Sequence, residues 1–93
     1  MIQLTPSHWK IVKDILSQYP YQFYAFGSRV KQKSRPLSDL DLCYKTDIPD
    51  AILTEINGQF SDSNLPFSVE LVNWNHCTTE FQTLISKDLV EIK

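Results

Sequence analysis

The chain has 93 residues, with nine basic and eleven acidic side chains and a formal net charge of −2. This length predicts one domain, residues 1–93, with a modest core. The charge balance argues against charge-driven binding to nucleic acid or membrane surfaces. The only glycines, Gly27 and Gly58, are too few for a GxGxxG fingerprint or a Walker-type phosphate loop.

Cysteine usage and hydropathy indicate a protein of the reducing cytoplasm. Cys43 and Cys77 form no CxxC pair, and a disulfide-dependent scaffold would use cysteine more densely. No run approaches the ~20 apolar residues of a membrane span. Neither His8 nor His76 has a second ligand at metal spacing, so we do not expect zinc.

The first predicted element is an amphipathic helix over Pro6–Tyr19, with Thr5 as its cap and Pro20 as its stop. The aromatic-rich segment Tyr21–Phe26 predicts a strand that ends at Gly27. A short basic helix is expected from Ser28 until Pro36 breaks the chain.

The alternation of acidic and apolar residues in Asp39–Tyr44 predicts a second strand with two different faces. Asp47 and Pro49 open a long helix that carries Gly58, and the polar cluster Ser61–Pro66 predicts a turn. A third strand is predicted over 67–73. Its core-facing side chains would be Phe67, Val69 and Leu71. Its opposite face would carry Ser68, Glu70 and Val72.

A last helix is predicted near Thr78–Ser86, with Phe81, Leu84 and Ile85 facing inward, and Leu89–Ile92 is expected to form a short final strand. This order of elements predicts an α/β (α+β) fold with a mixed sheet. The helices are expected to pack mainly on one face of that sheet.

Two aspartates carry the strongest chemical signal. Side chains two residues apart on a strand share a face, so Asp39 and Asp41 are expected to lie side by side. Neighbouring carboxylates repel unless a cation or strong donors lie between them. Mg²⁺ is held in this way by one or two carboxylates and substrate phosphate. Glu70 supplies a third carboxylate if the third strand lies beside the second.

Gly27 and Ser28 follow the first strand at a turn where backbone and hydroxyl donors can meet a phosphate. Four of the nine basic residues follow within seven positions: Arg29, Lys31, Lys33 and Arg35. Each feature alone has an ordinary interpretation, as a solvated strand edge, a turn or a solvated helix face. Together they favour a site for a metal-bound triphosphate.

These residues also resemble a known signature. Phe26–Arg29 followed by Arg35–Leu42 is similar to the GSR…SDxDL pattern of the minimal nucleotidyltransferases (MNT) of the DNA polymerase β superfamily. The resemblance covers nearly the whole chain. It implies the palm-like nucleotidyltransferase fold and transfer of a nucleotidyl group, usually AMP from ATP, with two Mg²⁺ ions.

The resemblance also implies a role for each matching residue. Gly27 and Ser28 would hold the β- and γ-phosphates, and Asp39 and Asp41 would ligate the metals. Glu70 would be the third catalytic carboxylate and metal ligand. The remaining nucleotide-binding positions would be Arg29 and Ser38.

The chain departs from the family at two positions. The third acid is commonly aspartate, and Glu70 is one methylene longer, which bears on turnover more than on nucleotide binding. Glycine is often found where this chain has Gln32, which affects the turn after Ser28.

Three functions follow from the resemblance. The first is an antitoxin that attaches AMP to a tyrosine of a HEPN-domain toxin encoded alongside it, within a hetero-oligomer. The alternative is a catalytically weak nucleotide-binding subunit that neutralises its partner by contact. Transfer to a small acceptor such as an antibiotic is the third, and the short chain, without an acceptor domain, argues against it.

Overall fold

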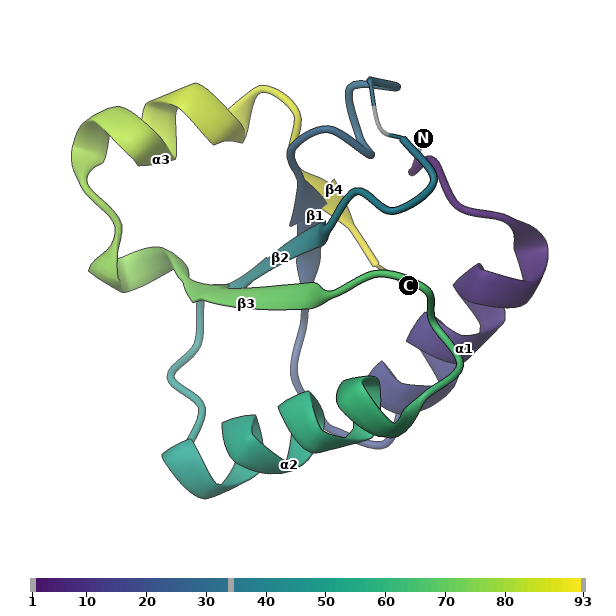
Figure 1. Ribbon diagram of the computed structural model, residues 1–93. Coiled ribbons are helices and arrows are strands. Elements are labelled where there is room, and N and C mark those ends of the chain that lie inside the picture. Colours follow the sequence, from purple (N-terminus) through teal and green to yellow (C-terminus); the bar gives the residue numbers. More distant parts are fainter. Residues whose placement is uncertain (1, 34, 93) are drawn as a thin grey trace.

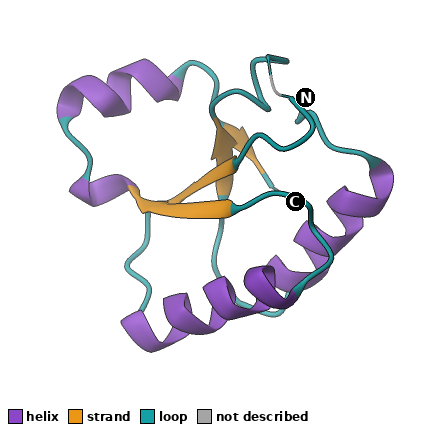
Figure 2. Ribbon diagram, viewed as in Figure 1, coloured by secondary structure: helices purple, strands orange, loops and turns teal. Residues whose placement is uncertain are grey.

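The computed structural model describes residues 2–33 and 35–92. The chain folds into a sheet with helices on both faces (Figures 1 and 2). In chain order the elements are α1 (Pro6–Leu16), β1 (Tyr24–Phe26), β2 (Leu40–Tyr44), α2 (Asp50–Asp62), β3 (Val69–Asn73), the 3-10 turn η1 (Trp74–His76), α3 (Thr79–Ser86) and β4 (Val90–Glu91).

The sheet is mixed, as predicted, with the strand order β3-β2-β1-β4. β1 runs antiparallel to both β2 and β4, whereas β3 runs parallel to β2. Parallel neighbours need a long crossover connection, and α2 provides it between β2 and β3. The crossover places the start of β3 beside the start of β2.

Two of the three helices cover one face of the sheet. Leu40 and Leu42 of β2 are fully buried against Val12 of α1 and Ile56 of α2. On the opposite face a smaller apolar cluster joins Cys43 to Ile85 of α3. α1 and α2 therefore lie on one side of the sheet and α3 on the other (Figure 1).

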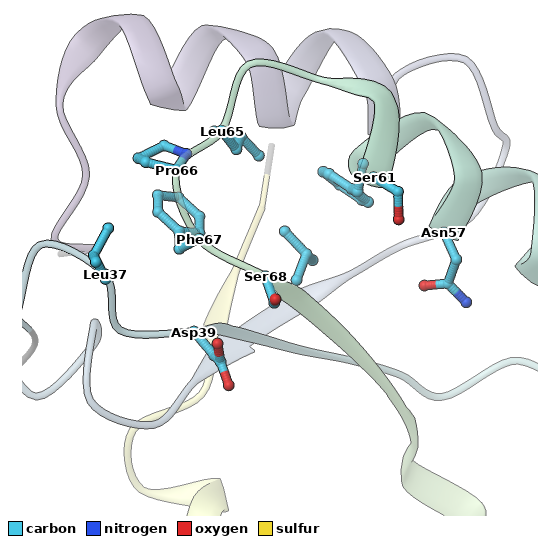
Figure 3. Close-up of a pocket in the computed structure, with 10 residues that line it drawn as sticks. Leu37, Asp39, Asn57, Ser61, Leu65, Pro66, Phe67 and Ser68 are labelled. Carbon is cyan, nitrogen blue, oxygen red and sulfur yellow. The ribbon is translucent and has the colours of Figure 1, made fainter.

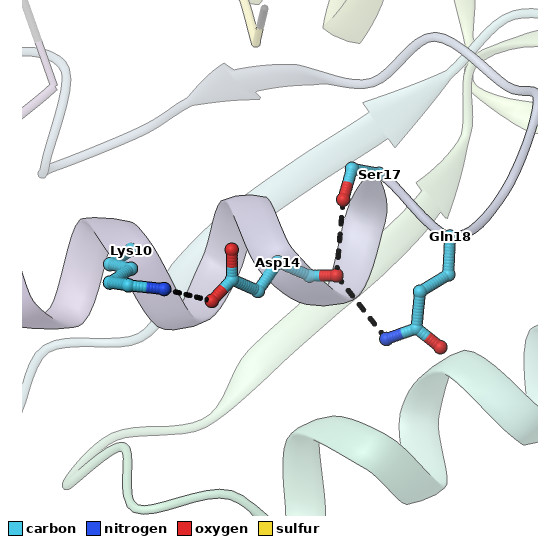
Figure 4. Close-up of polar contacts among 4 residues, drawn as sticks. All are labelled: Lys10, Asp14, Ser17 and Gln18. Atoms are coloured by element: carbon cyan, nitrogen blue, oxygen red, sulfur yellow. Dashed lines mark hydrogen bonds and ion pairs between the residues drawn. The ribbon is translucent and has the colours of Figure 1, made fainter.

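α1 begins where the sequence predicts and ends three residues earlier. The Thr5 hydroxyl caps its first turn by accepting from the backbone N–H of His8 at 3.2 Å. At the other end, the side chains of Ser17 and Gln18 donate to the carbonyl of Asp14, each at 3.2 Å (Figure 4). These bonds satisfy a carbonyl of the last turn, so the helix ends at Leu16. None of the helices among the described residues has the length and apolar character to cross a membrane.

The prediction of a short basic helix after Ser28 is wrong. The segment makes a single turn, in which Lys31 donates its backbone N–H to the Gly27 carbonyl at 3.1 Å. Lys33 then donates to the Ser28 carbonyl at 2.9 Å across Gln32, whose φ is 60°. This is the Schellman arrangement that ends helices with a left-handed residue, usually glycine. Gln32 thus occupies a backbone position that suits the family's glycine.

The inward stripe predicted for α3 is only partly correct. Ile85 is buried, but Leu84 is 61% exposed and Phe81 is 36% exposed. Phe81 touches the sheet through the edge of its ring, which meets the Phe26 ring with centroids 5.9 Å apart. Because the helix is short and meets the sheet along one narrow line, Leu84 lies on its outer side.

Gly58 offers a direct test of the α2 assignment. The residue lies inside the helix, and a Cβ built on it meets no atom within 4 Å. Gly58→Ala should therefore raise the free energy of unfolding by about 0.5–1 kcal/mol, because alanine loses less backbone freedom on folding. This corresponds to a rise in Tm of roughly 2–8 °C. Calorimetry measures it, and a fall in Tm would contradict the helix assignment.

Candidate active site

The acidic residues gather on the sheet face opposite α1 and α2. Asp41 of β2 is in register with Glu70 of β3 on one side and with Phe26 of β1 on the other. Asp39 lies two residues before Asp41, just ahead of β2, which begins at Leu40. Glu70 and Asp39 are exposed and Asp41 is partly buried. The structure therefore brings together the three carboxylates that the sequence singled out.

Their negative charges interact. The pKa of the Asp41 carboxyl lies above its ordinary value, first because burial disfavours the anion and then because Glu70 and Asp39 repel it. Burial and like charges both disfavour the ionised form of a carboxyl group, so the two effects act in the same direction here. Any positive charge placed among these three groups would stabilise Asp41 as a carboxylate.

Gly27 follows β1 at the edge of this cluster, and its close approach to Asp41 requires glycine. Its φ is +85°, a left-handed conformation that side chains disfavour. A Cβ at this position would lie 2.5 Å from Oδ2 of Asp41. The turn that begins at Gly27 is therefore packed directly against the Asp41 carboxylate of β2.

Arg29 is placed differently from the other basic residues of this segment. It is 5% exposed, and Phe67 lies beneath its guanidinium, 4.0 Å from the ring centroid. Its donors reach backbone carbonyls of two other segments, the Ser38 carbonyl twice and those of Gln3 and Pro36 once each, at 2.8–3.2 Å. Lys31, by contrast, is exposed and lies 3.7 Å from Asp88.

Ser38 belongs to the same polar arrangement. Its hydroxyl accepts the backbone N–H of Arg35 at 2.8 Å, and its carbonyl accepts from Arg29. These contacts close the turn immediately before Asp39. The structure thus gives Ser38 a clear part in shaping this turn, and its nucleotide-binding role stays a prediction.

The donor set fits Mg²⁺ in its chemistry. Hard divalent cations prefer carboxylate oxygens, and Mg²⁺ is commonly held by one or two of them together with substrate phosphate. Burial and then the charges of Glu70 and Asp39 raise the pKa of Asp41, and a cation would relieve the part due to those charges. Among residues 2–33 and 35–92, no group of three or more His, Cys, Asp or Glu side chains is arranged to hold a metal ion. Asp39, Asp41 and Glu70 would be the residues to hold one together with substrate phosphate.

A cavity of about 670 Å³ opens next to Asp39, between the starts of β2 and β3 and the last turns of α2. Figure 3 shows the apolar side chains of Leu65 and Phe67 on the segment between α2 and β3. The polar side chains that line the cavity are Asn57 and Ser61 of α2 and Ser68, just before β3. The sequence predictions missed Asn57 and Ser61, because no local pattern indicates that the end of α2 lies beside Asp39.

Cys43 plays no part in this chemistry. It shares the strand face of Asp41, but its side chain is fully buried, and desolvation raises the pKa of its thiol to about 11. A thiol with this pKa is a poor nucleophile at neutral pH. The interpretation of Cys43 as a small core residue is confirmed.

Comparison with known proteins places the chain in a family. A family model described as "Polymerase beta, Nucleotidyltransferase" matches residues 10–92. A protein of Haemophilus influenzae named "Probable protein adenylyltransferase MntA" is 40% identical over 87 residues, which cover 89% of this chain and 76% of that protein.

A solved structure has a similar fold. It is described as "Crystal structure of the toxin-antitoxin with AMP-PNP", and it matches with a TM-score of 0.67. The match covers 89% of this chain and 70% of that chain, at 18% sequence identity. The likeness confirms the α+β arrangement of the mixed sheet and its helices.

Alanine at Gly27 should have the opposite effect to alanine at Gly58. Gly27→Ala places a residue with a Cβ in a left-handed backbone conformation, at a cost of roughly 1–2 kcal/mol. The added Cβ also forces the Asp41 carboxylate to move. We expect a lower free energy of unfolding and the loss of nucleotide binding, measured by denaturant titration and calorimetric titration with Mg-ATP. Unchanged binding in a folded Gly27→Ala variant would show that the Gly27–Asp41 contact has no role in the site.

Proposed function

Because the chain belongs to the polymerase beta nucleotidyltransferase family and is a nucleotidyltransferase, we propose that it transfers AMP from Mg-ATP to a hydroxyl group of a partner protein. The observation that carries the proposal is the register of Asp41 with Glu70, beside Asp39 and against the Gly27 turn. This places an acidic cluster next to a phosphate-binding turn on one open sheet face.

The relatives support a protein as the acceptor. The Haemophilus influenzae protein is named a probable protein adenylyltransferase. The structural neighbour is described as a toxin-antitoxin complex with an ATP analogue. In the proposed function the acceptor is a tyrosine of a HEPN-domain toxin encoded alongside this chain. The chain acts as its antitoxin in a cytoplasmic hetero-oligomer.

The proposed reaction is a substitution at the α-phosphorus of ATP. The acceptor oxygen forms a bond to that phosphorus, and the bond from the phosphorus to the bridging oxygen of pyrophosphate breaks. Pyrophosphate leaves with the electron pair of that bond. The hydroxyl proton is taken up by a carboxylate, for which Glu70 is the candidate because it is exposed on β3 beside Asp41.

The other residues bind and orient the nucleotide. Gly27 and Ser28 would hold the β- and γ-phosphates, and Asp39 and Asp41 would hold two Mg²⁺ ions, with Glu70 as a further ligand. Bound Mg²⁺ neutralises phosphate charge and stabilises the leaving pyrophosphate. The residues Arg29 and Ser38 shape the backbone ahead of Asp39.

The direct test uses labelled ATP, Mg²⁺, this protein and the product of the neighbouring gene. We expect label on a tyrosine of the partner, identified by mass spectrometry, and none after chelation of the metal. An established family pair assayed in parallel shows that the conditions support transfer. Absence of label on the partner under those conditions would refute the proposal.

Asp41→Ala tests whether neutralisation of the toxin needs chemistry. Loss of this carboxylate should lower the transfer rate by at least about 10²-fold, the scale on which a single stabilising group at a reacting centre acts. Toxicity should return in cells that express the variant with its partner. Lys10→Ala is the matched control, because Lys10 is exposed on α1 and pairs only with Asp14. Neutralisation that survives Asp41→Ala would favour binding alone.

The length of Glu70 supports a second candidate function, a nucleotide-binding subunit that neutralises its partner by contact. Its side chain is one methylene longer than the usual aspartate, and it stands on the edge strand β3. Glu70→Asp separates the two functions. If the chain is an active transferase, we expect the natural protein to label the partner already. Activity that appears only in Glu70→Asp would identify the natural protein as the contact subunit.

A further inference from the structure

Arg29 is buried between three segments of the chain. Its guanidinium donates to the carbonyls of Ser38 and Pro36 in the turn before Asp39, and to Gln3 near the N-terminus. The contact with Gln3 is reciprocal, because the Gln3 backbone N–H donates to the Arg29 carbonyl at 2.7 Å. Arg29 thus connects the N-terminal segment to the turn that precedes the acidic strand.

The same side chain also contacts the segment that leads into β3. Phe67, which is 8% exposed, lies beneath the guanidinium and is followed three residues later by Glu70. Backbone pairing continues this link, since Leu40 donates its N–H to the Ser68 carbonyl at 2.9 Å. One buried cation therefore touches the approaches to both acid-bearing strands.

Burial at this position excludes an ordinary role as a surface cation. Every buried side-chain nitrogen or oxygen among the described residues has a hydrogen-bond partner, Arg29 included. Burial lowers the pKa of its guanidinium, and the charge of Asp39 acts in the opposite direction. The guanidinium therefore lies close enough to influence Asp39, while its hydrogen bonds go to the backbone.

We propose that Arg29 is a positioning residue, which holds the Pro36–Ser38 turn and thereby fixes Asp39, and that it is not a ligand of the nucleotide phosphates. The role of Asp39 itself rests on the proposed function. The geometry requires the planar, forked guanidinium: its four hydrogen bonds leave from three separate nitrogen atoms, whereas an ammonium group has three donors on a single atom.

This requirement gives a test that needs no activity. Hydrogen–deuterium exchange of the nucleotide-free protein should accelerate in residues 36–40 for both Arg29→Lys and Arg29→Met, and to a similar extent, because neither replacement spans the carbonyls. Arg35→Lys and Arg35→Met are the matched controls, since Arg35 belongs to the same segment and is exposed. Unchanged exchange in both Arg29 variants would overturn the proposal.

The kinetic test separates positioning from phosphate binding. If Arg29 positions Asp39, Arg29→Lys and Arg29→Met should lower kcat equally, by about 10²-fold, the cost of a shift of about 1 Å at a reacting centre. KM for ATP should change little. A lysine variant that keeps kcat, with a raised KM in Arg29→Met alone, would assign Arg29 to the phosphates and overturn the proposal.

Phe67→Leu keeps the test decisive if the Arg29 variants do not fold. The substitution removes the ring beneath the guanidinium and leaves the hydrogen bonds of Arg29. Exchange in residues 36–40 should therefore be faster than in the natural protein, but slower than in a protein in which this turn is disrupted. No rise in folded Phe67→Leu would count against the proposal. Failure of the natural protein to transfer AMP would refute the proposed function and leave the exchange result to decide the role of Arg29.

Discussion

The contact between Gly27 and Asp41 is the constraint on which the site depends. A backbone with a φ of +85° lies so close to a carboxylate oxygen that no Cβ fits between them. The contact arises because β1 and β2 are antiparallel neighbours, which places the residue after Phe26 beside the early part of β2. The same register continues from Asp41 to Glu70 on β3. The Gly27 turn, Asp41 and Glu70 therefore meet through the pairing of β1, β2 and β3, and Asp39 lies two residues before Asp41.

Most of this site could be predicted because its chemistry is local in sequence. Alternation of acid and leucine after Ser38 determined which side chains share a face, and the same period placed Glu70 opposite the core stripe of β3. The parallel pairing of β2 and β3 joins these two local patterns, and the helix predicted between them is long enough for the crossover that such pairing needs. The starts of β1 and β3 were predicted three and two residues too early, because apolar side chains in the approaching loops also pack on the core, as Phe23 and Phe67 do. The starts of β2 and β4 were each predicted one residue too early.

The parts that could not be predicted depend on contacts distant in sequence. Nothing near Arg29 indicates that its guanidinium turns inward to Gln3 and Ser38, and a run of alternate basic residues suggests a solvated helix face. The single turn after Ser28 ends at Gln32, a residue type that gives no signal for a left-handed cap. Leu84 was misplaced because helical spacing identifies an apolar stripe without saying how wide the partner surface is.

The strand pairing and the contacts of Arg29 both hold the acidic cluster in place, in a chain of low net charge. Three carboxylates on one face repel, and the pKa of Asp41 is raised first by burial and then by the charges of Glu70 and Asp39. Arg29 is the one buried charge among the described residues, and its hydrogen bonds go to backbone carbonyls. In our proposal these bonds fix Asp39 just ahead of β2. Arg29 reduces the repulsion only through proximity to Asp39. In the proposed function this repulsion would favour the binding of magnesium together with nucleotide: the metal would supply a counter-charge to the acids, and the phosphates would supply its remaining ligands.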